Sequence, residues 1–156
     1  FSHLDARNQP VMVDVGDKAV TRRTAHAVAV VTLPGELAAL LRDGEIATKK
    51  GPLFQTAILA GVMGAKRTSD LIPLCHPLLV GAVSISFDIG DDHVAVEASV
   101  DTVERTGVEM EALTAASVAA LTVYDMIKAI DRGAIIGPTQ LLEKSGGASG
   151  TWRRDG

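Results

Sequence analysis

Apolar and polar residues alternate along three segments of the chain. Residues 19–33, 83–89 and 94–100 place Val, Ile, Ala or Phe at roughly every second position, the period of a strand with one buried face. The second and third segments are separated only by the turn residues 90–92, so they predict a β-hairpin. Residues 139–142 predict a short final strand.

Three other segments space their apolar residues three and four positions apart, as helices do. A short helix is expected over 34–41, with Gly44 as its left-handed stop, and a second helix over 53–67. A long third helix is expected from about 109 to 131, where Gly and Pro are absent. Two prolines within 69–78 exclude a regular helix or a central strand, so an ordered connection is predicted there.

The predicted order is strand, helices, strand, strand, helix, strand. This order matches the ferredoxin-like split βαβ plan, an α+β fold whose antiparallel sheet carries its helices on one face. The 156 residues suit one domain, 1–156, that ends in a glycine-rich tail from about 145.

Composition adds an expectation about assembly. Hydrophobic residues make up 47% of the chain but aromatic residues only 3%, so the core must consist of Ala, Val, Leu and Ile. Such a composition leaves apolar sheet faces that a second subunit commonly covers. We therefore expect a homo-oligomer.

Charge and cysteine content limit which binding partners and which cellular compartment are expected. The 15 Lys and Arg residues are outnumbered by 19 Asp and Glu, which disfavours nucleic acid and requires a local basic cluster for any bound anion. Cys75 is the single cysteine and cannot form an internal disulfide, as in a reducing compartment. Because no apolar run approaches the ~20 residues of a membrane span, we expect a soluble, cytoplasmic protein without a membrane partner.

The predicted third helix carries a polar stripe within about one third of its circumference. The stripe comprises Glu111, Thr114, Ser117, Thr122, Asp125 and Lys128. One interpretation is an ordinary solvent-facing stripe in which Asp125 and Lys128 form a weak surface pair. The other is a stripe that faces a cleft, where this carboxylate and amine could exchange a proton.

Two lysines beside glycines are candidates for binding a phosphate. Lys50 precedes Gly51, and Lys144 precedes Ser145 and two glycines, so backbone amides could approach an anion closely at either place. A solvated lysine and a flexible tail are the alternatives. The chain has neither a Walker loop nor a dinucleotide fingerprint, so a standard nucleotide-binding fold is not supported.

The adjacent Cys75 and His76 do not predict a metal site, because no second Cys or His follows at metal-ligand spacing. A buried structural role is favoured for Cys75. His76 lies in a rigid segment before Pro77, where it could hydrogen-bond a ligand or titrate near neutral pH. A structural role for His76 stays equally open.

Five stretches resemble one family in sequence and in order. They are residues 12–15 (MVDV), 66–78 (KRTSDLIPLCHPL), 106–115 (TGVEMEALTA), 124–129 (YDMIKA) and 144–147 (KSGG). Over nearly its whole length the chain thus resembles the cyclic pyranopterin monophosphate synthase family, the MoaC proteins.

The resemblance implies a lyase of molybdenum cofactor (molybdopterin) biosynthesis. The family converts 3′,8-cyclo-7,8-dihydroguanosine 5′-triphosphate to cyclic pyranopterin monophosphate, a pterin, with release of pyrophosphate. It implies no resident cofactor or metal, although magnesium could accompany the triphosphate. It also implies a hexamer, a trimer of dimers, with sites between subunits.

The resemblance assigns roles to particular residues. Asp125 would be the central acid or base, Lys128 its helix partner, and Lys50 a proton-transfer or phosphate-holding residue. Residues expected to line the substrate site are Leu74, Cys75, His76, Met110, Glu111 and, from the same motif, Glu109, although Glu109 faces away from Glu111 on an ideal helix. Lys144 and Arg23 would bind the triphosphate. Many relatives have an acidic residue after the lysine–glycine pair, where this chain has Pro52, so the shape of that loop is not given by the resemblance.

Two other classes of function compete with this interpretation. A ferredoxin-like regulatory module would bind a nucleotide or pterin without converting it. A metal-dependent phosphohydrolase would use Glu109, Glu111 and His76 as ligands.

Overall fold

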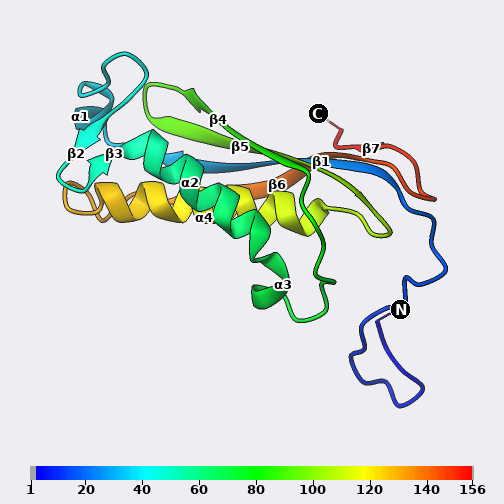
Figure 1. Ribbon diagram of the computed structural model, residues 1–156. Coiled ribbons are helices and arrows are strands. Elements are labelled where there is room, and N and C mark those ends of the chain that lie inside the picture. The colour runs from blue at the N-terminus through cyan, green and yellow to red at the C-terminus, as the bar shows by residue number, and fades with distance from the viewer. Residues whose placement is uncertain (1–2, 156) are drawn as a thin grey trace.

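A five-stranded antiparallel sheet forms one layer of the computed structural model, which describes residues 3–155 (Figure 1). The strand order is β4-β5-β1-β6-β7. The strands are β1 (Thr21–Thr32), β4 (Ala82–Ile89), β5 (His93–Glu104), β6 (Ile136–Ser145) and β7 (Trp152–Arg153). A separate two-stranded hairpin consists of β2 (Ala47–Thr48) and β3 (Gly51–Pro52).

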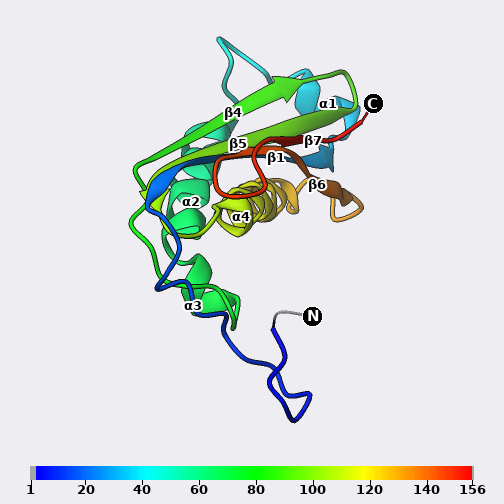
Figure 2. The ribbon, with the colours of Figure 1, turned by 90° about the vertical axis from the view of Figure 1, so that its right-hand side faces the viewer.

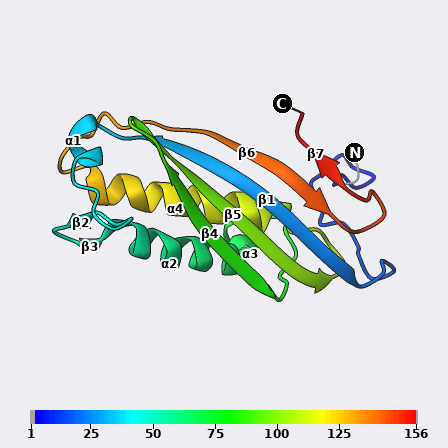
Figure 3. The same cartoon turned by 90° about the horizontal axis from the view of Figure 1, so that it is seen from above.

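Both long helices cover the same face of the sheet (Figure 2). They are α2 (Leu53–Lys66) and α4 (Glu109–Ile127), and two short helices, α1 (Gly35–Ala38) and α3 (Thr68–Leu71), lie in the connections. Seen from above, the sheet lies across both long helices (Figure 3). Since β1 pairs with β5 on one side and with β6 on the other, the predicted ferredoxin-like α+β fold is confirmed.

Small side chains let the layers approach closely. The side chains of β1 that face the helices include Ala25, Ala27 and Ala29, each at most 3% exposed. A Cβ added to Gly64 of α2 would lie only 3.0 Å from the Val118 side chain of α4. The last turn of α2 therefore packs closely against the middle of α4.

Several predicted boundaries were wrong. The third helix ends at Ile127 instead of Asp131, because the chain enters a turn in which the Asp131 carboxylate accepts a hydrogen bond from Gly133 N at 2.7 Å. The final strand is longer than 139–142, because β6 pairs along most of β1. The helix expected over 34–41 spans only Gly35–Ala38.

Short elements were also missed. Helix α3 includes the first three residues, 69–71, of the segment 69–78 that was predicted to be a non-helical connection. The Thr68 hydroxyl donates to the carbonyls of Gly64 and Ala65 and so extends the helical path before the first proline. The β2–β3 hairpin and β7 were not predicted either. β7 exists because the glycine segment turns the chain back so that Trp152 pairs with Lys144.

Among the described residues α4 alone has the length and hydropathy of a membrane-spanning helix. It is nevertheless the central helix of the domain, since 56% of its most apolar window is buried within the protein. Packing against the sheet and α2 accounts for its apolar composition.

Candidate active site

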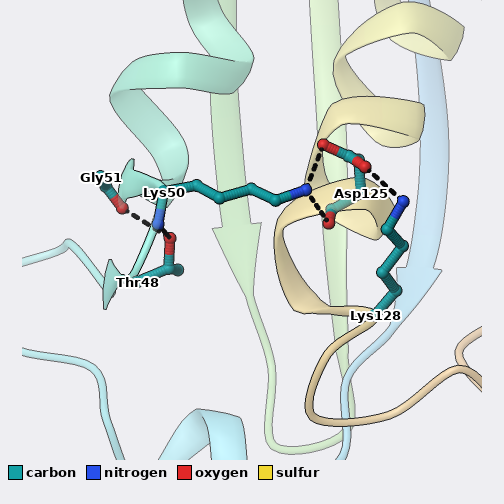
Figure 4. Close-up of polar contacts among 5 residues, drawn as sticks. All are labelled: Thr48, Lys50, Gly51, Asp125 and Lys128. Atoms are coloured by element: carbon teal, nitrogen blue, oxygen red, sulfur yellow. Dashed lines mark hydrogen bonds and ion pairs between the residues drawn. The ribbon is translucent and has the colours of Figure 1, made fainter.

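Asp125 lies between two lysines at the C-terminal end of α4 (Figure 4). Lys128, one turn further on, places Nζ 2.7 Å from Asp125 Oδ1. Lys50 arrives from the β2–β3 hairpin, and its Nζ lies 2.9 Å from Asp125 Oδ2 and 3.1 Å from the Asp125 carbonyl oxygen. We call Lys50, Asp125 and Lys128 the lysine cluster. All three residues were predicted to be catalytic, and the structure brings them together.

The electrostatics of the lysine cluster assign a charge to its carboxylate. Hydrogen bonds from Lys128 and Lys50, together with their positive charges, lower the pKa of Asp125 to about 2. Asp125 is therefore ionised at neutral pH and fixes both ammonium groups. The three side chains are about half exposed, so a ligand can reach them.

Local backbone geometry directs Lys50 toward this carboxylate. Lys49 and Lys50 form the tip of the hairpin, and Lys50 N donates to Thr48 Oγ1 at 3.1 Å. The Thr48 hydroxyl in turn donates to the Gly51 carbonyl at 2.8 Å, and Gly51 has φ of +113°, which favours glycine. Beside the tip is a hollow of about 440 Å³ lined mainly by hairpin residues and by Met126 and Ile130.

A second group of predicted residues lines a cavity of about 270 Å³ at the other end of α4. The group comprises Leu74, Cys75, His76, Glu109, Met110 and Glu111, and we call the cavity the carboxyl pocket. Glu109 and Glu111 were expected to face apart. They share the pocket because Glu109, the first residue of the helix, folds its carboxylate back over Gly107. His3 and Lys18 from the N-terminal segment also line it.

Burial raises the pKa of two groups in the carboxyl pocket. Glu111 is only 4% exposed, and this burial, together with the charge of Glu109, raises the pKa of Glu111 above its ordinary value. Burial and the charge of Glu111 likewise raise the pKa of the Cys75 thiol. A protonated thiol is a weak nucleophile. Cys75 is only partly buried, however, and lines the pocket, so it does not lie in the core as the predicted buried role requires.

Arg23 lies beside a third hollow, of about 510 Å³, that we call the glycine-edged pocket. Arg23 Nε donates to the Glu104 carbonyl at 3.1 Å, and a Cβ at Gly147 would collide with the Arg23 guanidinium. Lys144 lies nearby, with its Nζ donating to the hydroxyl of Ser149, one of the residues that line the pocket.

Sequence reasoning missed two residues of the glycine-edged pocket. Thr21 Oγ1 is buried without a hydrogen-bond partner among residues 3–155. Lys18 lines both this pocket and the carboxyl pocket, so it lies where the two hollows meet. Its position shortly after the MVDV stretch was the available signal.

The structure does not unite all predicted residues within one chain. Glu111 and Asp125 are 14 residues apart on α4, which at 1.5 Å per residue is about 21 Å. Figure 1 shows the β2–β3 hairpin beside the C-terminal end of α4 and the connection after α3 near its N-terminal end. His76 is therefore remote from Lys50 of the same chain. The polar stripe is also not uniformly open, because Glu111 and Thr114 are buried.

The metal-dependent alternative gains no support from the geometry. Glu109, Glu111 and His76 line one cavity, but within residues 3–155 no group of three or more His, Cys, Asp or Glu side chains is arranged to hold a metal ion.

A carboxylate that fixes two ammonium groups can organise proton transfer, and a pocket edged by Arg23 and glycines can receive an anion. The fold and the site thus define a ferredoxin-like acid–base enzyme for an anionic substrate. The model of the MoaC family matches residues 12–147, and the chain belongs to this family.

Similar proteins extend over almost the entire chain. A cyclic pyranopterin monophosphate synthase of Thermomicrobium roseum is 54% identical across 99% of this chain and 93% of its own length. The cyclic pyranopterin monophosphate synthase of Streptomyces coelicolor is 53% identical across 99% of this chain and 89% of its own length. The cyclic pyranopterin monophosphate synthase 2 of Mycobacterium bovis is 50% identical across 99% of this chain and 91% of its own length.

Proposed function

We propose that this chain is a cyclic pyranopterin monophosphate synthase. It converts 3′,8-cyclo-7,8-dihydroguanosine 5′-triphosphate to cyclic pyranopterin monophosphate and releases pyrophosphate, a lyase step in molybdenum cofactor biosynthesis. Membership of the MoaC family supports this function. The observation that carries the site is the convergence of Lys50 and Lys128 on Asp125, 2.7–2.9 Å away.

The chemistry needs the groups that the site provides. Opening the five-membered ring of guanine and closing a pyrazine ring requires repeated proton transfers, which lysine ammonium groups and carboxyl groups can perform. Asp125, ionised at neutral pH, holds Lys50 and Lys128 in place. In the carboxyl pocket His76 and Glu111 hold the ring system.

The triphosphate occupies the glycine-edged pocket. Arg23, Lys144 and the amides after Gly146 bind its negative charge, and Lys18 lies between this pocket and the carboxyl pocket. Cyclisation onto the innermost phosphate expels pyrophosphate, so cations placed beforehand stabilise the charge that develops. No resident metal takes part, and magnesium enters only with the triphosphate.

The complete site is formed between two copies of the chain. A two-fold axis across the middle of α4 would place the lysine cluster of one copy against the carboxyl pocket of the other, which overcomes the separation of about 21 Å along the helix. Exposed apolar side chains on α2 and α4, among them Leu59 (66%), Met63 (54%) and Leu121 (57%), suit burial by another copy. Three such dimers form a hexamer, which works in the cytoplasm.

The test is incubation with the cyclised guanosine triphosphate. The expected products are pyrophosphate and, after oxidation, a fluorescent pterin, in thoroughly chelated buffer as well. GTP, which lacks the additional ring bond, yields neither product. Tight binding of the cyclised triphosphate without pyrophosphate release would favour the regulatory module, which the names of the relatives do not support.

A further inference from the structure

Helix α2 begins without a capping side chain of its own. Its N-cap residue is Pro52, which makes no side-chain hydrogen bond to the first turn. The first backbone N–H groups of a helix lack partners within the helix and need acceptors from elsewhere.

Glu45, eight residues before the start of α2, supplies these acceptors. Its Oε1 accepts a hydrogen bond from Phe54 N at 2.8 Å and its Oε2 accepts one from Gln55 N at 3.0 Å. Oε1 also accepts from Ile46 N at 2.8 Å, at the other end of the loop. One carboxylate thus connects both ends of the segment that carries Lys50.

Electrostatics favour an ionised carboxylate at this position. Burial alone would raise the pKa of Glu45, but the N–H donors of Phe54, Gln55 and Ile46 outweigh it and hold the pKa below its ordinary value. The positive end of the α2 dipole acts in the same direction.

The segment between these bonds is short and anchored. Ile46 and Leu53 are fully buried, and Leu53 N donates to the Ile46 carbonyl at 2.9 Å. Only the β2–β3 hairpin projects beyond this pair, with Lys50 at its tip and Lys50 Nζ on Asp125. The direction of Lys50 therefore depends on how the base of the hairpin is held.

We propose that Glu45 is the positioning residue for Lys50: its carboxylate clamps the base of the β2–β3 hairpin to the first turn of α2 and so aims the Lys50 amine at Asp125. Glu45 does not touch the reacting atoms. It acts through the loop, as an acidic cap supplied from outside the helix.

The first readout does not depend on the proposed function. Acetylation by acetic anhydride, followed by mass spectrometry, compares the reactivity of Lys50 with that of its neighbour Lys49, which has no ion-pair partner among residues 3–155. In the wild-type protein Lys50 reacts more slowly, because its amine is held in hydrogen bonds to the carboxylate and the carbonyl oxygen of Asp125. In Glu45→Ala the two rates become equal, whereas Glu36→Ala, an exposed acidic residue in the first turn of α1, leaves the difference intact.

The second readout rests on the proposed function. We expect Glu45→Ala to lower kcat on the order of tenfold, because Lys50 loses its alignment, with KM changed less than about twofold. The double variant Glu45→Ala/Pro52→Asp restores a capping carboxylate at the extended N-cap position and should recover most of kcat and the slow acetylation of Lys50.

A purely structural role predicts a different pattern. Glu45→Ala would then melt at a lower temperature but keep both the slow acetylation of Lys50 and the wild-type kcat below its melting point, which would overturn the proposal. If Glu45→Ala does not fold, Glu45→Gln replaces it, because glutamine retains one acceptor oxygen. Acetylation of Lys50 at a rate between its wild-type rate and that of Lys49 supports the proposal, whereas acetylation as slow as in the wild type overturns it. A wild-type protein without activity would refute the proposed function and leave the acetylation result to decide the role of Glu45.

Discussion

Replacing Asp125 with Asn tests the lysine cluster, because it exchanges one carboxylate oxygen for an NH₂ group and leaves the size of the side chain unchanged. The two carboxylate oxygens serve different partners, since Lys128 contacts Oδ1 and Lys50 contacts Oδ2. An amide offers one oxygen and one NH₂ group, so it must present a donor to one of the two ammonium groups. That ammonium group loses its orientation, and both ammonium groups lose their counter-ion.

The size of the effect follows from the charge that is lost. Because the pKa of Asp125 is about 2, the carboxylate is fully ionised at pH 7, and Asn removes a whole negative charge from between two cations. A positioned acid–base group contributes about 10²–10⁴ in rate, so kcat should fall by at least about 100-fold. KM should change little, because the triphosphate binds in the glycine-edged pocket.

The assay is steady-state release of pyrophosphate from the cyclised triphosphate, with urea denaturation to check folding. Asp88→Asn is the matched control, because Asp88 is exposed on β4 and has no ion pair within residues 3–155. The urea midpoint of Asp125→Asn should fall only slightly below that of the wild type, since the side chain is half exposed and solvent screens its ion pairs. Wild-type kcat in Asp125→Asn would refute the role of the carboxylate.

The low pKa of Asp125 also predicts a pH dependence. A depressed carboxyl pKa contributes stability above the ordinary value of 3.8, and this contribution is lost only as pH falls toward about 2. Protonation of Asp125 therefore cannot cause a loss of kcat between pH 5 and 7. An acid limb in that range that disappears in Asp125→Asn would contradict this assignment.

Other regions of the molecule give further predictions. Glu111→Gln should have a higher melting temperature than the wild type at pH 8 and lose this advantage as the pH falls toward 4.5. The pKa of Glu111 is raised in the folded protein, so ionisation of this buried acid at high pH destabilises the fold. Identical melting curves for the two proteins at both pH values would contradict the burial argument. Gly64→Ala should lower the free energy of unfolding by about 1–3 kcal/mol in urea denaturation, since its Cβ would crowd Val118, whereas Gly35→Ala, with open space around it, should be tolerated. Arg23→Ala should raise KM about tenfold, an effect that weakens in high salt, and an unchanged KM would place the triphosphate elsewhere.

The regular elements were predictable because burial on one face imposes a period on the sequence. The alternation over 94–100 places Val94, Val96, Ala98 and Val100 on the face that the helices cover. The short elements depend on distant contacts and have no such period. β7 is held by pairing with β6, and α3 by a threonine hydroxyl bonded to the preceding helix.

The residues of the candidate site were predictable from motifs, but their distances were not. Asp125 and Glu111 share a predicted stripe, yet the length of the helix separates Asp125 from the carboxyl pocket that Glu111 lines. The contact between Lys50 and Asp125 joins residues 75 positions apart, which no local pattern gives. The sequence did not predict the shape of the loop before Pro52. That shape depends on Glu45, whose carboxylate accepts hydrogen bonds from three backbone N–H groups that come together only in the folded chain.

Mixing two inactive variants tests the central claim, that the lysine cluster of one copy acts on a substrate held in the carboxyl pocket of another. Asp125→Asn damages only the cluster and His76→Ala only the pocket, so a dimer of the two contains one site with both parts intact. Refolding the variants together in equal amounts should restore about a quarter of the wild-type sites, because half of the dimers are mixed and each has one intact site of two. If each site lay within a single chain, the mixture would stay as inactive as either variant alone.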